Sequence, residues 1–335
     1  MRPVSLRFAV VGYGTMGRHH TRNLGEMDGV EIVGVVETVA ASRDEAARAG
    51  LPTFAAISDL GNLAIDAAII CVPTSEHESI AHHFIERHCA VLIEKPIGLT
   101  MHQGWRIIDH AQSRNVCVMV GYVERYNPAI TELRRFIHEG NIGQILTMSA
   151  RRVGAFPPRI RDANVIIDMG VHDIDMAAFI ISCPLNLIAA QGGRGIQEDR
   201  IDYASLVLEA DGISIDIVTN WLTPVKIRDL SITGTRGYCH VDYMTQRVLF
   251  MPGRSFSPSN SYEALVAQYI GSDTVQLPVI SEEPLKLELQ AFARGIKGGS
   301  LPNPALALES LRIAQEATAE IEGRISQRTS QRMKA

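Results

Sequence analysis

The 335-residue sequence has no hydrophobic run long enough to cross a membrane and no surplus of positive charge. Its longest apolar stretches, such as Ala67–Val72, are far shorter than the roughly 20 residues of a bilayer-spanning helix. The first predicted strand begins within a few residues of the N-terminal residue, and no signal-peptide pattern precedes it. The formal net charge of −5 provides no basic excess for a nucleic-acid backbone. We therefore expect a cytoplasmic protein that binds neither membranes nor nucleic acids.

The sequence is also poor in cysteine, and none of its cysteines has CxxC spacing. An odd number without pairing is typical of thiols in a reducing compartment, not of a disulfide framework. The five are Cys71, Cys89, Cys117, Cys183 and Cys239. A cluster of potential zinc ligands at His82, His83, His88 and Cys89 lacks the paired spacing of structural zinc motifs, so we expect no metal.

Short apolar segments alternate with helical patterns over the first 120 residues of a chain that is 46% hydrophobic and 21% charged. This composition is that of a globular protein, and the length allows two domains. The alternation predicts a doubly wound parallel sheet with right-handed crossovers. The predicted strands are Arg7–Val11, Glu31–Val36, Ala67–Cys71, Ala90–Ile93 and Val116–Val120. The predicted helices are Met16–Glu26, Ser42–Ala49, Glu76–His88 and Thr100–Ser113, the last opened by a capping box of Thr100 and Gln103.

The pattern changes near Tyr122, where strands without intervening helices predict mainly antiparallel pairing. The strands expected there are Ile145–Val153, Tyr203–Glu209, Ile213–Trp221, Arg228–Thr233 and Tyr238–Val241. The helices expected there are 127–138, 165–181 and 304–322. We thus predict an α/β domain over 1–122, an α+β domain over 123–323 and a frayed polar tail over 324–335. The helix at 304–322 is a candidate to pack back on the first domain.

A glycine-rich turn joins the first predicted strand to the first predicted helix. Its sequence is Gly12-Tyr13-Gly14-Thr15-Met16-Gly17, a GxGxxG pattern at the start of a βαβ unit. Gly12 suits the tight turn, Gly14 lets the backbone approach a pyrophosphate, and Gly17 allows close packing of helix on strand. The helix N-terminus would supply N–H groups to the phosphates. This context predicts a dinucleotide-binding Rossmann domain, the alternative being a glycine-rich turn without a ligand.

An acidic residue, Glu37, ends the second predicted strand, twenty residues after Gly17. A carboxylate at this place accepts hydrogen bonds from the adenosine ribose and repels a 2′-phosphate. The following residues Thr38 to Ala41 offer no cation in its place. The expected cofactor is therefore NAD, although a solvated glutamate at a strand end would look the same in sequence.

Lys95 follows the fourth predicted strand within the sequence Glu94-Lys95-Pro96. Ligands of open α/β sheets sit beyond the carboxyl ends of the strands, so Lys95 is expected to face the cofactor crevice. There its ammonium could hold a substrate oxygen. The alternative is a lysine paired with a neighbouring carboxylate such as Glu94.

An acid and a histidine, Asp168 and His172, lie four residues apart in the helical stretch of the second domain. This spacing places both on one helical face. A carboxylate raises the basicity of an imidazole, as a general base near neutral pH requires. Asp175 is an alternative partner of His172, and such a pair on a helix is often only structural.

Taken together, three segments resemble the glucose-fructose oxidoreductase, inositol dehydrogenase and MocA family: EKP at 94–96, GYVERYNP at 121–128 and DxGxH at 168–172. The resemblance implies a Rossmann domain, then an open-faced, mainly antiparallel sheet that builds homodimers or homotetramers. It implies Lys95, Asp168 and His172 as catalytic residues. It also implies cofactor contacts from the glycine loop, Glu37, Pro73, Thr74, His77, Glu94 and Lys95.

Within that family, residues 121–128 and 149–162 are similar to members that act on nucleotide sugars. Four arginines at positions 151, 152, 159 and 161 would suit a diphosphate. The resemblance implies oxidation of the 3-hydroxyl of UDP-N-acetylglucosamine, feeding an aminotransferase in lipid A biosynthesis. The implied substrate-binding residues are Arg125, Tyr126, Asn127, Arg152, Arg159, Arg161, Asp168 and His172.

Other roles for these residues, and other functions, remain open. At least two of the four arginines are expected to form surface ion pairs, Asn127 could be only a helix cap, and Arg125 only an ion-pair partner. The enzyme could oxidise another sugar, such as the corresponding UDP-uronate or a free polyol. A dinucleotide-sensing regulator without catalysis is the more distant alternative.

Overall fold

The computed structural model describes residues 5–158, 163–253, 261–263 and 273–332 and divides into two compact units. The first unit comprises Met1–Tyr126 together with Glu283–Leu311. The second comprises Asn127–Glu282 together with Arg312–Ala335. Each unit is therefore assembled from two separate stretches of chain, whereas the domains predicted from the sequence were continuous.

A six-stranded parallel sheet forms the centre of the first unit, in the order β3-β2-β1-β4-β5-β6. The order reverses between β1 and β4, which is where a Rossmann fold binds its dinucleotide. Strands β4, β5 and β6 are buried throughout, which explains their continuous apolar sequences. The strands are β1 (Leu6–Val11), β2 (Val30–Val36), β3 (Thr53–Phe54), β4 (Ala67–Ile70), β5 (Ala90–Glu94) and β6 (Val118–Gly121).

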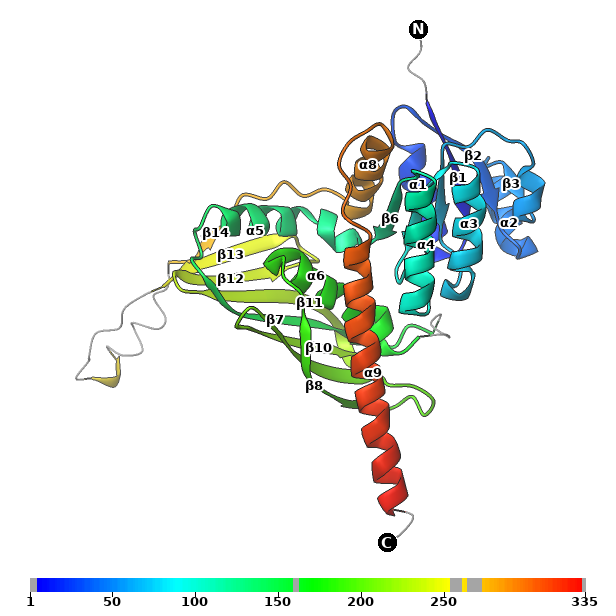
Figure 1. Ribbon diagram of the computed structural model, residues 1–335. Helices are drawn as coiled ribbons and strands as arrows, with labels where there is room; N and C mark the ends of the chain where they lie inside the picture. The colour runs from blue at the N-terminus through cyan, green and yellow to red at the C-terminus, as the bar shows by residue number, and fades with distance from the viewer. Residues whose placement is uncertain (1–4, 159–162, 254–260, 264–272, 333–335) are drawn as a thin grey trace. The chain divides into compact units, whose positions relative to one another are not determined.

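Helices flank this sheet, and α3 and α4 pack side by side (Figure 1). The predicted capping box opens α4, because the backbone N–H of Gln103 donates to Thr100 Oγ1 (3.2 Å) and Thr100 N–H donates to Gln103 Oε1 (3.3 Å). The helices are α1 (Thr15–Gly25), α2 (Ala40–Arg48), α3 (His77–Glu86), α4 (Met101–Ser113) and α8 (Pro284–Ile296). Short helical turns are η1 (Ile57–Leu60), η2 (Thr74–Glu76) and η3 (Val123–Tyr126).

Helix α8 was not predicted, although it completes the core of the first unit. Leu285, Leu289 and Phe292 follow a helical period and are buried. The ring of Phe292 meets that of Phe8 on β1 edge to face, with centroids 6.1 Å apart. Burial of one apolar face against the sheet thus returns this late segment to the N-terminal unit.

An eight-stranded, mainly antiparallel sheet forms the second unit, in the order β14-β13-β12-β11-β7-β10-β9-β8. Within this sheet, only the β7–β10 pair is parallel among the described strands. In β10, Ile215 and Ile217 are buried while Ser214 and Asp216 are exposed, as their alternation predicted. The strands are β7 (Ile145–Ala155), β8 (Asn186–Gly193), β9 (Tyr203–Ala210), β10 (Ile213–Asn220), β11 (Leu222–Gly234), β12 (Gly237–Asp242), β13 (Arg247–Pro252) and β14 (Val275–Gln276).

Helices α5 (Pro128–His138) and α6 (Val171–Ile181) lie along one face of this sheet (Figure 1). A π-helical turn, η4 (Ile166–Gly170), leads directly into α6. On β7, the exposed residues Thr147, Ser149 and Arg151 alternate with the buried residues Met148, Ala150 and Arg152. The face of the sheet that carries them is thus open, and the predicted combination of a Rossmann domain with an open-faced, mainly antiparallel sheet is confirmed.

The predicted frayed tail is wrong, because α9 runs from Ala305 to Arg332. Its second half is held by tertiary contacts: Ile321 is buried, and Arg324 donates to the carbonyl of Ala190 on β8 (3.0 Å). At the start of α9, Leu308 packs closely on Gly104 of α4, where an added Cβ would lie 2.3 Å from Leu308 Cδ2. The polar composition of residues 324–335 had suggested a helix that ends at 322, ten residues before the end of α9.

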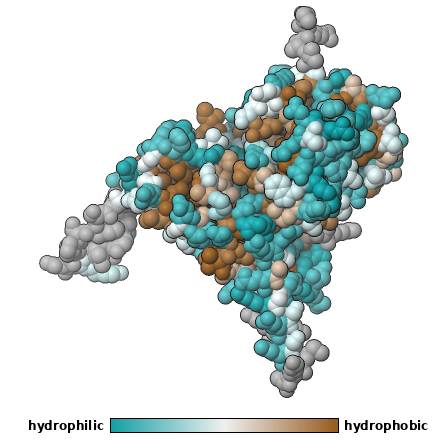
Figure 2. Space-filling view, in the orientation of Figure 1, coloured by the Kyte–Doolittle hydropathy of each residue, from teal (hydrophilic) through white to brown (hydrophobic). Residues whose placement is uncertain are grey.

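In the described ranges, the helices are too short or too polar for a membrane span. On the face drawn in Figure 2, hydrophobic areas are interrupted by hydrophilic surface.

Candidate active site

The glycine loop has the geometry that its sequence predicted. Gly12 has a φ of +91°, and a Cβ there would lie 2.7 Å from the carbonyl oxygen of Cys71. A Cβ on Gly17 would lie 2.0 Å from the carbonyl oxygen of Gly12. By contrast, a Cβ on Gly14 would meet nothing within 4 Å, and no side chain caps the start of α1. The loop is thus closed on the strand side and open where a pyrophosphate would bind.

Glu37 lies next to this loop at the end of β2 and is 9% exposed. Its Oε2 accepts a hydrogen bond from the backbone N–H of Tyr13 (2.7 Å), and its Oε1 accepts one from Val39 N–H (2.7 Å). These two bonds fix the carboxylate beside the glycine loop, where an adenosine ribose is expected. Arg43 on α2 donates to the carbonyl oxygens of Glu37 and Thr38, a nearby cation that the sequence analysis did not consider.

The segment after β5 carries Lys95, which is partly exposed between buried neighbours. Glu94 Oε1 lies 2.8 Å from Nε2 of His20 on α1, and the ring of His20 is fully buried. The Lys95–Pro96 peptide bond is cis. Through His20, Glu94 contacts the interior of the unit, whereas Lys95 lies at the carboxyl edge of the sheet. The cofactor contact expected of Glu94 stays a prediction.

The segment after β4 carries the other expected cofactor residues. Pro73 is exposed and Thr74, partly exposed, begins η2. His77 behaves differently, because its ring is buried and both nitrogens contact backbone carbonyls, Nδ1 that of Pro96 (3.0 Å) and Nε2 that of Val72 (3.0 Å). The structure thus places His77 between the segment after β4 and the segment after β5, and the cofactor contact expected of it stays a prediction.

A buried group of charges lies behind this edge in the first unit. Arg125, 7% exposed, places its guanidinium over the ring of Tyr122, 5.3 Å from its centroid. Glu288 on α8 is 1% exposed, and its burial, together with the charge of Glu94, raises its pKa well above the ordinary value against the opposing effect of Arg125. Arg125 is therefore buried in the first unit, and the substrate contact expected of it stays a prediction.

Asp168 and His172 lie on either side of the junction between η4 and α6 in the second unit. Both are partly exposed, whereas Gly170, Val171 and Asp173 around them are buried. Asn164 opens this helical run, since its Oδ1 accepts from the N–H groups of Ile166 and Ile167 (3.0 Å each). Such π turns are frequent at functional sites. Asp175, the alternative partner of His172, is fully buried.

Two of the four predicted diphosphate arginines have other partners. Arg152 is 1% exposed, and its Nε and Nη2 donate to both carboxylate oxygens of Asp173 (3.0 and 3.1 Å). Arg151 is paired with Asp229 across the sheet (2.5 Å). Removing one partner of a buried pair typically costs about 3–5 kcal/mol, so loss of Arg152 would destabilise the fold, and the substrate contact expected of it stays a prediction. Arg159 and Arg161 lie outside the described residues.

Tyr126 and Asn127 also have inward contacts. The hydroxyl of Tyr126 donates to Sδ of Met119 (3.5 Å). Asn127 is the N-cap of α5, since its Oδ1 accepts from Ala129 N–H (3.1 Å) and its Nδ2 donates to the carbonyl of Tyr243 (3.2 Å). The helix-cap interpretation of Asn127 therefore describes its contacts.

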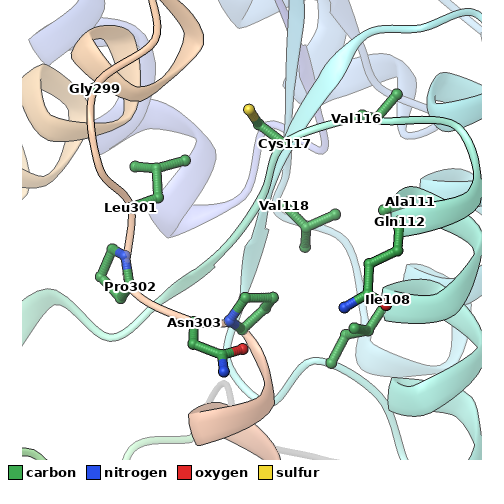
Figure 3. Close-up of a pocket in the computed structure, with 11 residues that line it drawn as sticks. Ile108, Ala111, Gln112, Val116, Cys117, Val118, Gly299, Leu301, Pro302 and Asn303 are labelled. Atoms are coloured by element: carbon green, nitrogen blue, oxygen red, sulfur yellow. The ribbon is translucent and has the colours of Figure 1, made fainter.

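A hollow in the first unit is lined by none of the residues expected to bind the cofactor (Figure 3). Ile108 and Ala111 of α4, Val118 of β6, and Leu301 and Pro302 before α9 line it. It lies at the amino end of β6, whereas a Rossmann fold binds nucleotides at the carboxyl ends of its strands. The hollow is therefore not the cofactor site.

Two family descriptions match the chain in the order of its two sheets. An oxidoreductase family with an NAD-binding Rossmann fold matches residues 6–122, and the GFO/IDH/MocA C-terminal domain matches residues 130–240. The chain belongs to the Gfo/Idh/MocA oxidoreductase family. This assignment confirms the predicted family and NAD as the cofactor, and the glycine loop fits that cofactor because of the open space at Gly14.

Individual relatives of this Gfo/Idh/MocA oxidoreductase have several activities. Rhizopine catabolism protein MocA from Rhizobium meliloti is 31% identical over 52% of the chain, and the match spans about half (56%) of that relative. UDP-N-acetylglucosamine 3-dehydrogenase from Acidithiobacillus ferrooxidans is 27% identical, and the match covers 72% of the chain and 75% of that relative. Its solved structure has a TM-score of 0.82 at 22% identity, over 96% and 99% of the two chains. scyllo-Inositol 2-dehydrogenase (NAD(+)) from Bacillus subtilis is 25% identical, and the match covers 89% of the chain and 88% of that relative.

Sequence reasoning missed three residues that act on expected site residues of the Gfo/Idh/MocA Rossmann unit. His20 contacts Glu94, Arg43 contacts the carbonyl of Glu37, and Glu288 interacts electrostatically with Glu94. A signal existed for His20, because it follows Gly17 by three residues on the buried side of α1. The period of Leu285, Leu289 and Phe292 could have revealed α8 and with it Glu288. The interaction of Arg43 with the end of β2 has no local signature.

Proposed function

We propose that this Gfo/Idh/MocA oxidoreductase oxidises the 3-hydroxyl of UDP-N-acetylglucosamine to a ketone, with NAD as the hydride acceptor. The relative from Acidithiobacillus ferrooxidans with that activity supports the substrate, since it is 27% identical over 72% of the chain. The resemblance of residues 121–128 and 149–162 to nucleotide-sugar members of the family points the same way. A 3-keto sugar is a suitable substrate for an aminotransferase, which would consume the product.

The observation that carries this proposal is the partial exposure of Asp168 and His172, which lie one helical turn apart beside the buried residues Gly170, Val171 and Asp173. A partly exposed imidazole one turn after a carboxylate is suited to accept a proton from a bound alcohol. The negative charge of Asp168 would stabilise the imidazolium that forms. The two residues thus supply a base where a substrate can reach it.

Alcohol oxidation removes a hydride from carbon and a proton from oxygen. NAD, when bound, accepts the hydride. In this proposal His172 takes the hydroxyl proton, and the ammonium of Lys95 donates to a substrate oxygen and favours its deprotonated form. Arg159 and Arg161 are proposed to bind the diphosphate, since guanidinium groups form paired hydrogen bonds with phosphate oxygens.

The experiment is to mix purified protein with NAD and a panel of UDP-sugars and polyols and to follow NADH absorbance. The carbon oxidised in the active mixture is then identified by NMR. We expect NADH to form with UDP-N-acetylglucosamine and the product to carry a ketone at C3. No NADH with any UDP-sugar would reject the proposed substrate.

A free polyol is the second candidate substrate. The scyllo-inositol 2-dehydrogenase of Bacillus subtilis aligns over 89% of the chain, a longer match than that of the nucleotide-sugar enzyme. In addition, Arg151 and Arg152 are engaged by Asp229 and Asp173. NADH formation with scyllo-inositol and not with UDP-sugars would favour this alternative.

We also propose that the open face of the eight-stranded sheet joins copies of the chain into a homodimer or homotetramer. Thr147, Ser149 and Val218 on this face are exposed. Light scattering of the native protein, compared with a Val218→Lys variant, tests this assignment. A native monomer would exclude it.

A further inference from the structure

The segment that carries Lys95 is held on both sides by buried histidines of the first unit. Before Lys95, the carboxylate of Glu94 contacts Nε2 of His20 (2.8 Å), and His20 belongs to the helix that follows the glycine loop. After Lys95, the carbonyl of Pro96 lies 3.0 Å from Nδ1 of His77 on α3. Lys95 itself is partly exposed between these two fixed neighbours.

The ring of His77 lies between two carbonyl oxygens, and a neutral ring can donate to only one of them. Nδ1 is 3.0 Å from the oxygen of Pro96, and Nε2 is 3.0 Å from that of Val72. Burial lowers the pKa of His77, so the ring is neutral near pH 7 and has a single N–H. The tautomer therefore decides which of the two loops is held by a hydrogen bond.

Two features make the bond to Pro96 the more important one for the position of Lys95. Val72 follows Cys71, whose backbone is already fixed by a hydrogen bond from Cys71 N–H to Val11 O (2.8 Å) and by the close approach of Gly12. Pro96 has no N–H of its own to anchor the segment beyond Lys95. A donor to its carbonyl thus contributes more to the placement of Lys95 than a donor to Val72 contributes.

We propose that His77 is a positioning residue whose Nδ1–H holds the carbonyl of Pro96 and so fixes the segment bearing Lys95. Its importance for turnover rests on the proposed function, in which Lys95 holds the substrate oxygen. His77 acts through its neighbour and need not touch substrate or NAD.

The tautomer can be read in the native protein without any substitution. Nitrogen-15 NMR of the 11 histidines distinguishes a protonated Nδ1 from a protonated Nε2, and the signal of His77 is identified by its loss in His77→Gln. We expect His77 to carry its proton on Nδ1. A proton on Nε2 would overturn the proposal, since the ring would then donate to Val72.

Two substitutions separate positioning from stability. In His77→Asn the amide nitrogen occupies the position of Nδ1, and in His77→Gln it occupies that of Nε2. Both should lower the urea midpoint of unfolding similarly, because each loses one ring contact. Only His77→Gln should lower kcat, on the order of tenfold to a hundredfold, with the Kd for NAD within about twofold of native. His88→Asn, at an exposed position with φ +55°, is the matched control. Equal kcat values for the two His77 variants would contradict the proposal.

A readout independent of turnover keeps this test separate from that of the proposed function. The chain has only five lysines, Lys95, Lys226, Lys286, Lys297 and Lys334, so the NMR signal of carbon-13-methylated Lys95 can be assigned with Lys95→Arg. His77→Gln should shift this signal, whereas His77→Asn and His88→Asn should not. If no sugar is oxidised, the proposed function fails, but a shifted Lys95 signal still supports the role of His77. An unshifted signal in His77→Gln overturns that role.

Discussion

The carboxylate of Glu37 accepts a 2.7 Å hydrogen bond from the backbone N–H of Tyr13, and this bond joins the end of β2 to the glycine loop. A second bond, from Val39 N–H, fixes the other carboxylate oxygen. The negative charge is therefore held beside the expected ribose position before any cofactor binds. Such preorganisation favours a ribose with free hydroxyls and disfavours a 2′-phosphate.

We expect Glu37 to determine the preference for NAD over NADP. Glu37→Ser combined with Thr38→Arg should raise NADP use and weaken NAD use roughly tenfold to a hundredfold, since a charge-assisted hydrogen bond contributes about 1.5–3 kcal/mol. Thr38→Arg alone is the control, because this variant retains Glu37, whose carboxylate still repels the 2′-phosphate. kcat/KM for the two cofactors is the measurement. Native protein that used NADP as well as NAD would show that Glu37 does not discriminate.

His172→Ala should lower kcat by roughly a hundredfold to ten-thousandfold, the usual contribution of a general base, and leave NAD binding intact. In native enzyme, turnover should fall as pH drops through the apparent pKa of the histidine, which is about 6.5 when unperturbed. That acid limb should disappear in the variant. His138→Ala, at an exposed position of α5, is the control. Near-native turnover of His172→Ala with an unchanged acid limb would leave Lys95 as the base.

Arg159→Ala or Arg161→Ala should weaken UDP-sugar binding roughly tenfold to a hundredfold, because one charge-assisted contact to the diphosphate is lost. NAD affinity should be nearly unchanged. Arg151→Ala removes a guanidinium that is paired with Asp229 on the open sheet face, so this control should bind UDP-sugar normally. Calorimetry with UDP is the measurement, and unchanged binding in both variants would exclude these arginines from the site.

Glu288 should make the protein less stable as pH rises. Its pKa is higher in the folded chain than in the unfolded chain, mainly because of burial, so folding retains a proton that the unfolded chain loses. The free energy of unfolding is not reduced below the ordinary glutamate pKa. Above that pKa it falls with rising pH, by about 1.4 kcal/mol for each pH unit between the two pKa values. Glu288→Gln should therefore raise the urea midpoint near pH 8 and change it little near pH 4. Glu282→Gln, at an exposed position, serves as the control, and equal shifts at both pH values would contradict the assignment.

Features that depend on nearby residues were predictable from the sequence. The roles of Gly12, Gly14 and Gly17 follow from backbone sterics, and the capping box of Thr100 follows from the unsatisfied N–H groups of a helix end. The alternation in β10 likewise follows from the two-residue period of a strand. In each case the spacing along the chain is also the spacing in space, so the sequence contains the necessary information.

What the sequence alone determined was the Rossmann unit, its cofactor and the antiparallel second sheet, because these rest on local periods and short motifs. Only the tertiary structure decided the partners of polar residues. Glu94 meets His20 across 74 positions, Arg152 meets Asp173 across 21, and α8 returns to pack on β1. The sequence alone does not distinguish an arginine that pairs with a carboxylate in the core from one that binds a phosphate. Their environments differ because a buried charge requires a specific partner, and the folded chain determines which partner lies within reach.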